Sequence, residues 1–183
     1  MTTTEVIVLC LAIMMAVFVA WMVIERRRTA RLRERFGPEF ERVAGTEGMR
    51  RASAILEARE KRMAHLNIRP LGRTESIRYI EEWRLVQGRF VDDPLGATAQ
   101  ADRLVEEALR ARGFPMSDFV QQAADLSVDH PDLVENYRVA HDIAQMAQRG
   151  QASTEELRRA MQHYRAVMEG ITEKEVHEPI PTR

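Results

Sequence analysis

The sequence predicts an all-α protein with one N-terminal transmembrane helix, a basic helical stalk and a small bundle of about four to five helices. Three observations predict this fold class. An uncharged run covers Val6 to Ile24. Apolar residues recur at three- and four-residue spacing through most of the remaining chain, which is typical of amphipathic helices. Helix caps, glycines and prolines separate these segments, and no convincing strand pattern is present.

The first element is the apolar run Val6 to Ile24, which we interpret as an uncleaved membrane anchor. Nineteen residues at about 1.5 Å each come close to the ~30 Å hydrocarbon thickness of a bilayer. Trp21 lies near the end of the run, where an interfacial aromatic residue is expected. A cleaved signal peptide fits poorly because residues 1–5 contain no basic side chain. A lipoprotein attached at Cys10 fits poorly because no pair of small residues precedes the cysteine.

The orientation follows from the basic residues that come directly after the run. Positively charged flanks stay in the cytoplasm. We therefore expect residues 1–5 outside the membrane and the remaining chain in the cytoplasm; an outward-facing module is the alternative. The same side chains are candidate contacts for anionic lipid head groups, unless they serve only to set the topology. They are Arg26, Arg27, Arg28, Arg31, Arg33 and Arg35.

Charge divides the soluble part into two regions. Residues 25–73, the predicted stalk, carry a net charge of +7, whereas residues 74–183 carry −7, although the whole chain has only −1. The acidic distal region, with its predicted bundle at 74–171, argues against nucleic-acid binding because nucleic-acid proteins present basic surfaces. We expect the polar, proline-containing tail 172–183 to be disordered.

The stalk is predicted as two helices after the membrane helix. The membrane helix can continue to Arg35 and end at Phe36-Gly37-Pro38, because Pro38 suits the first position of a new helix. A short helix then precedes a longer one over Glu47 to Leu66, and the loop Asn67 to Arg73 follows because it contains Pro70 and Gly72.

Polar residues at the starts of apolar segments predict the helix caps of the bundle. Asp93 is followed by Pro94, a favoured first helical residue, and Ser153 with Glu156 forms a capping-box pattern. Gly113 and Gly150 are placed to end two of the helices. The predicted N-caps, in chain order, are Thr74, Asp93, Ser117, Asp129 and Ser153.

The densest polar cluster is the predicted loop Asp125 to Asp132. Asp125, Asp129 and His130 lie in or beside it, and His141 comes close if the following helix folds back. Carboxylates and imidazoles bind metals and perform acid–base chemistry. The spacing matches no known metal motif, and an acid before a helix-opening proline is the ordinary chemistry of a cap. We therefore expect no metal, no cofactor and no catalytic residue. We expect His141 and His163 to be buried and hydrogen-bonded, and Trp83, Tyr137 and Tyr164 to be core residues with bonded polar ends, with an aromatic pocket as the alternative.

Three short runs carry a family resemblance. They are Arg35-Phe36-Gly37-Pro38-Glu39, Arg89-Phe90-Val91-Asp92-Asp93-Pro94, and Ala124-Asp125-Leu126-Ser127-Val128-Asp129-His130-Pro131, the last followed by Tyr137-Arg138 and His141. With these runs the chain resembles a bacterial family of single-span membrane proteins across nearly the whole soluble part. The resemblance implies the architecture, but no activity, cofactor or catalytic residue.

Two functional hypotheses remain at this point. The first is a membrane-tethered, non-enzymatic interaction or scaffold module, which faces the cytoplasm and meets an unknown protein partner through the distal bundle. The second is a helical bundle that binds a small ligand or a metal, with or without enzymatic activity, at the Asp125 to Asp132 loop. The sequence specifies neither the partner nor the oligomeric state.

Overall fold

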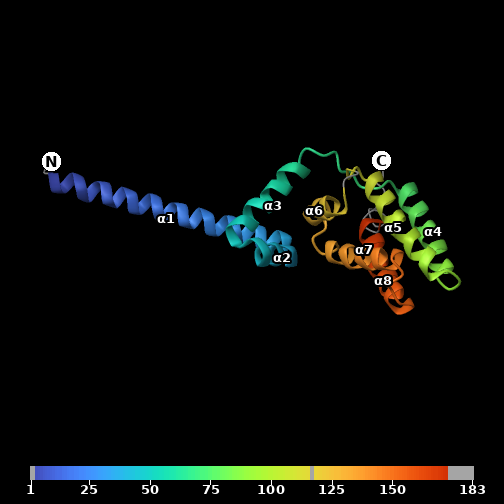
Figure 1. Cartoon of the computed structure of the whole chain (residues 1–183). Helices are drawn as coiled ribbons and strands as arrows, with labels where there is room; N and C mark the ends of the chain where they lie inside the picture. Colours follow the sequence, from blue (N-terminus) through green and yellow to red (C-terminus); the bar gives the residue numbers. More distant parts are fainter. Residues whose placement is uncertain (1–2, 116–117, 173–183) are drawn as a thin grey trace, which may run out of the picture. The chain divides into compact units, whose positions relative to one another are not determined.

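The computed structural model describes residues 3–115 and 118–172, with side chains described from Leu11 onward. Helices are the only regular elements in this described part, so the all-α prediction is confirmed. In chain order they are α1 (Thr3–Phe36), α2 (Pro38–Glu47), α3 (Met49–Met63), α4 (Arg73–Arg89), α5 (Pro94–Ala111), α6 (Phe119–Asp129), α7 (Val134–Gln148) and α8 (Thr154–Thr172) (Figure 1).

The chain divides into two compact units, Met1–Glu57 and Ala58–Arg183. The division falls inside α3, whereas the charge pattern and the Pro70 loop had suggested a boundary after Arg73. The last turns of α3 therefore belong with the bundle, although their sequence has the basic composition of the stalk.

In the first unit, α2 folds back beside the end of α1 (Figure 1). The reversal occurs at Gly37, whose φ of 48° lies in the left-handed region that favours glycine. Pro38 then opens α2, as predicted. Arg33 of α1 pairs with Glu41 of α2 at 2.6 Å. The predicted end of the first helix at Phe36-Gly37-Pro38 is thus confirmed.

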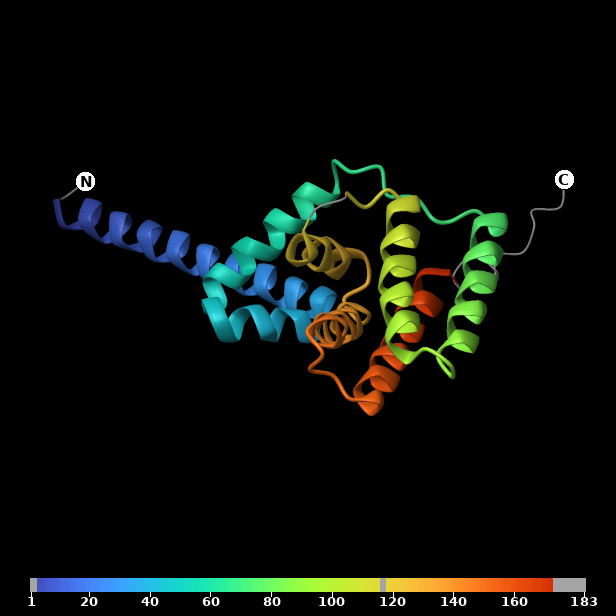
Figure 2. The ribbon, with the colours of Figure 1, turned by 45° about the vertical axis from the view of Figure 1, so that its right-hand side comes forward.

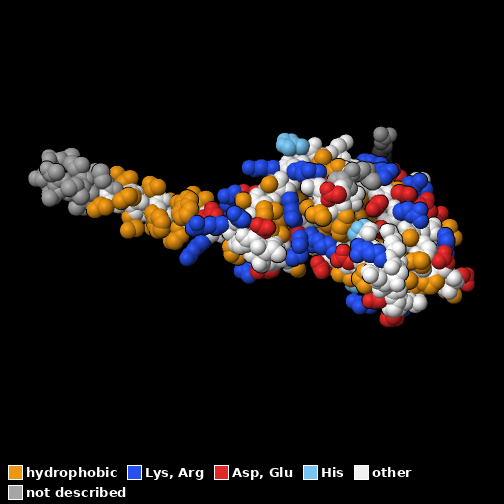
Figure 3. Space-filling model, in the orientation of Figure 1, with side chains coloured by type: hydrophobic (Ala, Val, Ile, Leu, Met, Phe, Trp, Pro, Cys, Tyr) orange, Lys and Arg blue, Asp and Glu red, His pale blue; other side chains and the backbone are white. Residues whose placement is uncertain are grey.

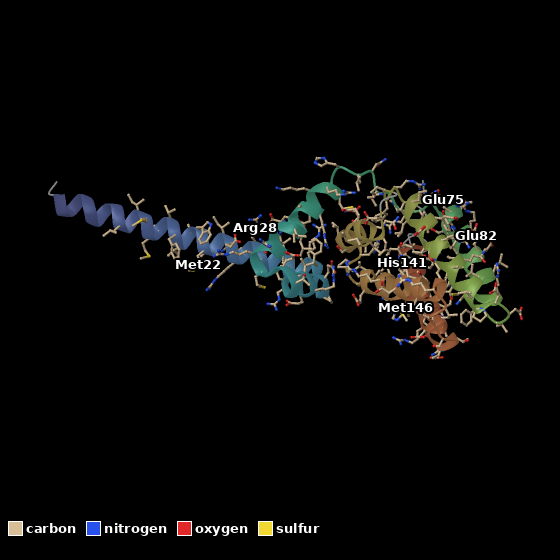
Figure 4. All side chains as sticks on the ribbon, viewed as in Figure 1. Met22, Arg28, Glu75, Glu82, His141 and Met146 are labelled. Carbon is tan, nitrogen blue, oxygen red and sulfur yellow. The ribbon has the colours of Figure 1, made fainter. Side chains whose placement is uncertain are left out.

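The start of α3 also contacts α1. Arg28 forms a two-point ion pair with Glu57, and the hydroxyls of Thr29 and Ser53 lie 3.5 Å apart. Figure 4 marks Arg28 at this end of α1. These contacts fix α3 beside the basic end of α1. The buried apolar side chains of the unit are Leu32, Phe36, Phe40, Val43, Ala52 and Leu56.

The N-terminal part of α1 has a different surface. From Leu11 to Ile24 every side chain is apolar, and all but Met22 are exposed. Figure 3 shows hydrophobic side chains covering the visible face of this segment up to the first arginines. Among the residues whose side chains are described, no helix meets the length and hydropathy needed to cross a membrane. Val6 to Cys10 of the predicted span lie outside those residues, and the transmembrane helix stays a prediction.

The second unit is a helical bundle, as predicted. In it α8 packs against α4, α5 and α7, while α7 also packs against α5 and α6 (Figure 2). Its largest fully buried side chains include Tyr137, Tyr164, Leu109 and Leu126. The apolar stripes predicted at three- and four-residue spacing form this core.

Of the five predicted caps, two are confirmed, and two, Thr74 and Asp129, are wrong. The Asp93 carboxylate accepts the N–H of Gly96 at 2.8 Å, and Ser153 exchanges hydrogen bonds with Glu156. Thr74 is not a cap, because α4 begins one residue earlier and the Glu75 carboxylate accepts the N–H of Gly72 at 2.8 Å. Ser117 lies outside the described residues. The next residue, Asp118, caps α6 by accepting the Gln121 N–H at 3.0 Å.

The loop predicted over Asp125 to Asp132 is also wrong over most of its length. Helix α6 continues to Asp129, because Leu126 and Val128 extend its buried face. Pro131 disfavours helical geometry at the residue before it, and α6 accordingly ends before His130. Helix α7 begins only at Val134, so Asp129 is the exposed last residue of α6 and caps nothing.

Candidate functional site

The most connected polar group of the bundle centres on Asp102 of α5. Its Oδ1 accepts a hydrogen bond from the Tyr164 hydroxyl of α8 at 2.6 Å and lies 3.1 Å from Nδ1 of His141 on α7. Asp102 is only 8% exposed and Tyr164 is fully buried. One carboxylate therefore joins three helices inside the core. Figure 4 marks the position of His141.

The His141 ring is fixed on several sides. It stacks on the ring of Phe119 at a centroid distance of 3.7 Å, and Nε2 lies 3.5 Å from the side-chain nitrogen of Gln145. Nearby, the Tyr137 hydroxyl donates to the Gln122 side-chain oxygen of α6 at 3.1 Å. These contacts extend the polar group from α5, α7 and α8 to α6.

Burial sets the protonation of this region. It raises the pKa values of the Tyr137 and Tyr164 hydroxyls far above the usual range for tyrosine, and the nearby Asp102 carboxylate raises them further. Burial also raises the pKa of Glu106, one turn along α5, with a smaller contribution from Asp102. Both tyrosines therefore stay protonated and act as permanent hydrogen-bond donors.

The Asp102–His141 pair resembles the carboxylate–histidine pair of a general-base site. A carboxylate that holds a histidine through Nδ1 can orient Nε2 toward a substrate. Here Nε2 makes a polar contact with Gln145 on the same helix, and the His141 side chain is 12% exposed. The observed partners of Asp102, His141 and Tyr164 lie within the bundle. The geometry thus favours a polar network that fixes how the helices pack.

The four sequence-predicted metal candidates are not brought together. Asp125 is fully buried on α6, where Oδ1 accepts from Gln121 at 2.7 Å and lies 3.3 Å from Nε of Arg62. His130 is buried and its Nε2 lies 2.7 Å from Arg112. His141 pairs with Asp102, and Asp129 is exposed. The described residues contain no group of three His, Cys, Asp or Glu side chains placed to hold a metal ion.

The predicted lipid-contacting arginines fall into two sets. Arg26 and Arg27 are exposed on α1. Arg28 pairs with Glu57 and Arg33 with Glu41, while Arg31 and Arg35 have further interactions within the protein. Some of the positive charge beside the apolar run therefore also stabilises the first unit, and lipid contact remains a prediction.

An open groove between α4 and α5 was not predicted from the sequence. It has a volume of about 450 Å³, and Leu85 in its wall is 74% exposed. Acidic side chains, Glu82 and Glu107, lie toward one end, whereas Arg89 and Arg103 lie toward the other. The only sequence signal was an apolar residue, Leu85, next to the buried stripe of α4.

Asp102 was not predicted from the sequence either. A signal was present, because this acid lies between Ala101 and Leu104 in the apolar stripe of α5, where a buried carboxylate needs partners. Its partners come from α7 and α8, 39 and 62 residues further along the chain. Local spacing gives no indication of such distant pairs.

Comparison with known proteins adds no further assignment. No protein-family model matches the chain, and neither a curated protein nor a solved structure matches it.

Proposed function

We propose that this protein is a non-enzymatic interaction module that is tethered to the bacterial inner membrane, with residues 1–5 outside and the helical bundle in the cytoplasm. The observation that carries the proposal is the surface of α1 between Leu11 and Ile24. Thirteen of these fourteen apolar residues are exposed, around the whole circumference of the helix. A helix that is apolar on all sides is unfavourable in water and is typical of a membrane span or a buried core helix.

The sequence on either side supports the tether. The apolar run extends in sequence back to Val6 and is followed by Glu25-Arg26-Arg27-Arg28. Arginines at this position favour a cytoplasmic C-terminal side and attract anionic head groups by about 1 kcal/mol per residue near the membrane surface. All six arginines are exposed, and Arg26 and Arg27 lie nearest to the apolar run, which makes them the best placed for such contacts.

The bundle supports a role in contact rather than in chemistry. Several of its buried polar residues bond to one another across helices, as Asp102 does with Tyr164 and His141. Satisfied networks of this kind rigidify a core and fix a single packing arrangement. A rigid helical domain with an open surface groove is suited to presenting a constant surface to a partner.

Membrane extraction of the full chain tests the tether. We expect the protein to stay in the membrane pellet after an alkaline carbonate wash, which removes peripheral proteins. The double variant Met15→Asp/Val19→Asp places two charges on one face of the apolar helix and should move the protein to the supernatant, because each costs about 2.5–3.5 kcal/mol at the centre of a bilayer.

The matched control is Val91→Asp/Leu95→Asp, which changes two exposed apolar residues of the bundle. This control should stay in the pellet. A parent chain that the carbonate wash releases would contradict the tether, and so would release of both double variants alike.

A further inference from the structure

We propose that the groove between α4 and α5 binds a second copy of this chain, with α4 packed antiparallel on α4 of the second copy. The inference names a partner for the proposed interaction module and in that sense rests on the proposed function. The groove itself belongs to the second unit alone, so its geometry does not depend on how the two units are placed.

The charges along α4 are complementary to themselves in the antiparallel direction. Glu82 comes three residues before Leu85, and Arg89 comes four residues after it. A two-fold axis that crosses α4 at right angles near Leu85 places Glu82 against Arg89 of the second copy, and Arg89 against its Glu82. Each symmetric contact forms twice, which is the property of an isologous interface.

Helix α5 carries the same polarity. The Tyr79 hydroxyl donates to the carbonyl oxygen of Glu107 at 3.2 Å, which fixes Glu107 near the Glu82 end of the groove. At the other end, Nη1 of Arg89 donates to the Gln100 side chain at 3.3 Å. Arg103 of α5 also lines the groove, and its guanidinium turns toward this end because Nε donates to the Ala99 carbonyl oxygen at 3.2 Å. If the two α4 helices were parallel instead, Glu82 would face Glu82 of the second copy and Arg89 would face its Arg89. Electrostatics therefore selects the antiparallel arrangement.

Leu85 supplies the apolar centre of the contact. It is 74% exposed, and in the proposed dimer it meets Leu85 of the second copy on the axis. Val86 and Leu104 line the groove beneath it. A central apolar anchor with charged residues around it is the usual anatomy of a specific interface.

The existing partners of Arg89 leave it able to take part. Its Nη2 donates to Asp93 at 2.7 Å and its Nη1 to Gln100, but a guanidinium has five N–H donors. Glu82 makes a long i,i+4 contact of 3.9 Å with Arg78. A membrane tether would also confine the copies to one plane, which raises their effective concentration.

Energy transfer between donor- and acceptor-labelled full chains in liposomes tests the inference. We expect transfer that declines as unlabelled lipid dilutes the protein. Leu85→Asp should weaken association roughly tenfold or more, because it puts two carboxylates on the axis and removes the apolar contact. The control is Val91→Asp, which changes a residue that is 83% exposed and does not line the groove. It should associate as the parent does.

Disulfide formation gives a second, geometric readout. In a Cys10→Ser background, Leu85→Cys should form a covalent dimer rapidly under mild oxidation in membranes, because the axis brings the two thiols together. Val91→Cys, at a position that is 83% exposed, should form far less. A monomeric parent chain, Leu85→Asp that associates normally, or equal cross-linking at both positions would overturn the proposal.

The outcomes separate this inference from the proposed function. A chain that stays in carbonate-washed membranes but is monomeric would refute the groove dimer and leave the tether standing, and the groove would then be open to a different protein. A chain that dimerises through Leu85 but is released by carbonate would support the dimer and refute the tether.

Discussion

At the scale of single residues, the bundle depends on a few buried polar contacts whose partners lie far apart in the chain. Asp102 accepts from Tyr164 across 62 residues, and Asp125 on α6 receives Arg62 of α3. A buried carboxylate without such partners would be strongly unfavourable. The arrangement of helices and the positions of these polar groups therefore support each other.

Tyr164→Phe should lower the free energy of unfolding by about 1.5–3 kcal/mol, because it removes a hydrogen bond to a buried carboxylate. Tyr137→Phe is the matched control, since Tyr137 is equally buried but donates to a neutral amide oxygen at 3.1 Å, and should cost about 0.5–1.5 kcal/mol. Chemical denaturation of the full chain measures both. Equal losses would mean that the hydrogen bond to the Asp102 carboxylate is no stronger than the bond to the neutral amide oxygen of Gln122.

The pair Asp93→Ala and Asp129→Ala separates a true cap from an exposed helix end. Asp93→Ala should lower the melting temperature by roughly a few degrees, because it removes the bond to the Gly96 N–H at the start of α5. Asp129→Ala should leave it nearly unchanged, because Asp129 lies at the end of α6. Calorimetry measures both melting temperatures. An equal drop in melting temperature for the two variants would contradict the observed start of α5 and end of α6.

Glu75 makes stability depend on acid pH. Hydrogen bonds from Arg69 and from the Gly72 N–H lower the pKa of its carboxyl from 4.5 to about 2. Because the folded pKa lies below the unfolded value, its stabilising effect is present above pH 4.5 and is lost as pH falls toward 2. Glu75→Gln should therefore lower the free energy of unfolding at pH 7. This difference from the parent should disappear as the pH falls from 4.5 to about 2.

The arginine partner provides the control for this pH effect. In an Arg69→Ala background, which removes the largest cause of the shift, Glu75→Gln should have a smaller effect at pH 7. Stability measured by denaturation from pH 2 to pH 7 gives the comparison. A Glu75→Gln difference that stays constant across this range would refute the linkage.

At the scale of elements, glycine positions show which turns tolerate change. Gly113 follows α5 at φ 99°, and a Cβ there would lie 2.5 Å from the backbone oxygen of Asn67. Gly150 follows α7 at φ 70° with open space around it. Both are C-terminal glycines in the left-handed region, but only Gly113 also packs against another chain segment.

Gly113→Ala should destabilise the protein by several kcal/mol, because the strain of positive φ adds to a clash with backbone that cannot move freely. Gly150→Ala should cost only about 1–2 kcal/mol, from the positive φ alone. Unfolding of the two variants by denaturant makes the comparison. Similar values would show that the Asn67 segment moves away without cost.

The sequence predicts elements well where the signal is local. Gly37-Pro38, Asp93-Pro94 and Ser153 with Glu156 each carry their cap or turn within a few residues, and the structure confirms all three. Asp125 to Pro131 was misplaced because its polar residues suggested a loop, whereas the buried face of α6 continues through Leu126 and Val128. Tertiary packing outweighed local polarity there.

The candidate site was predicted less well than the helices. His141 was expected to be hydrogen-bonded in the core and it is, but its partner is Asp102 rather than the residues near Asp129. The groove depends on how α4 and α5 pack, and a single stripe such as that around Leu85 does not reveal which side of a helix stays open.

At the scale of the whole molecule, the chain combines two compact units with different chemistry. The first joins an apolar, exposed helix segment to an arginine-rich end, and the second is a helical bundle with a buried polar network and an open groove. This combination suits a protein that holds a contact surface at a membrane.

The topology of the full chain, measured with two C-terminal reporters in separate fusions, is the most direct test of a bundle tethered at the cytoplasmic face of a membrane. One reporter is a fluorescent protein that matures only in the cytoplasm, and the other is a phosphatase that is active only outside it. We predict fluorescence without phosphatase activity, because Arg26, Arg27 and their neighbours favour a cytoplasmic bundle. Phosphatase activity without fluorescence would contradict this orientation and place the bundle in the cell envelope.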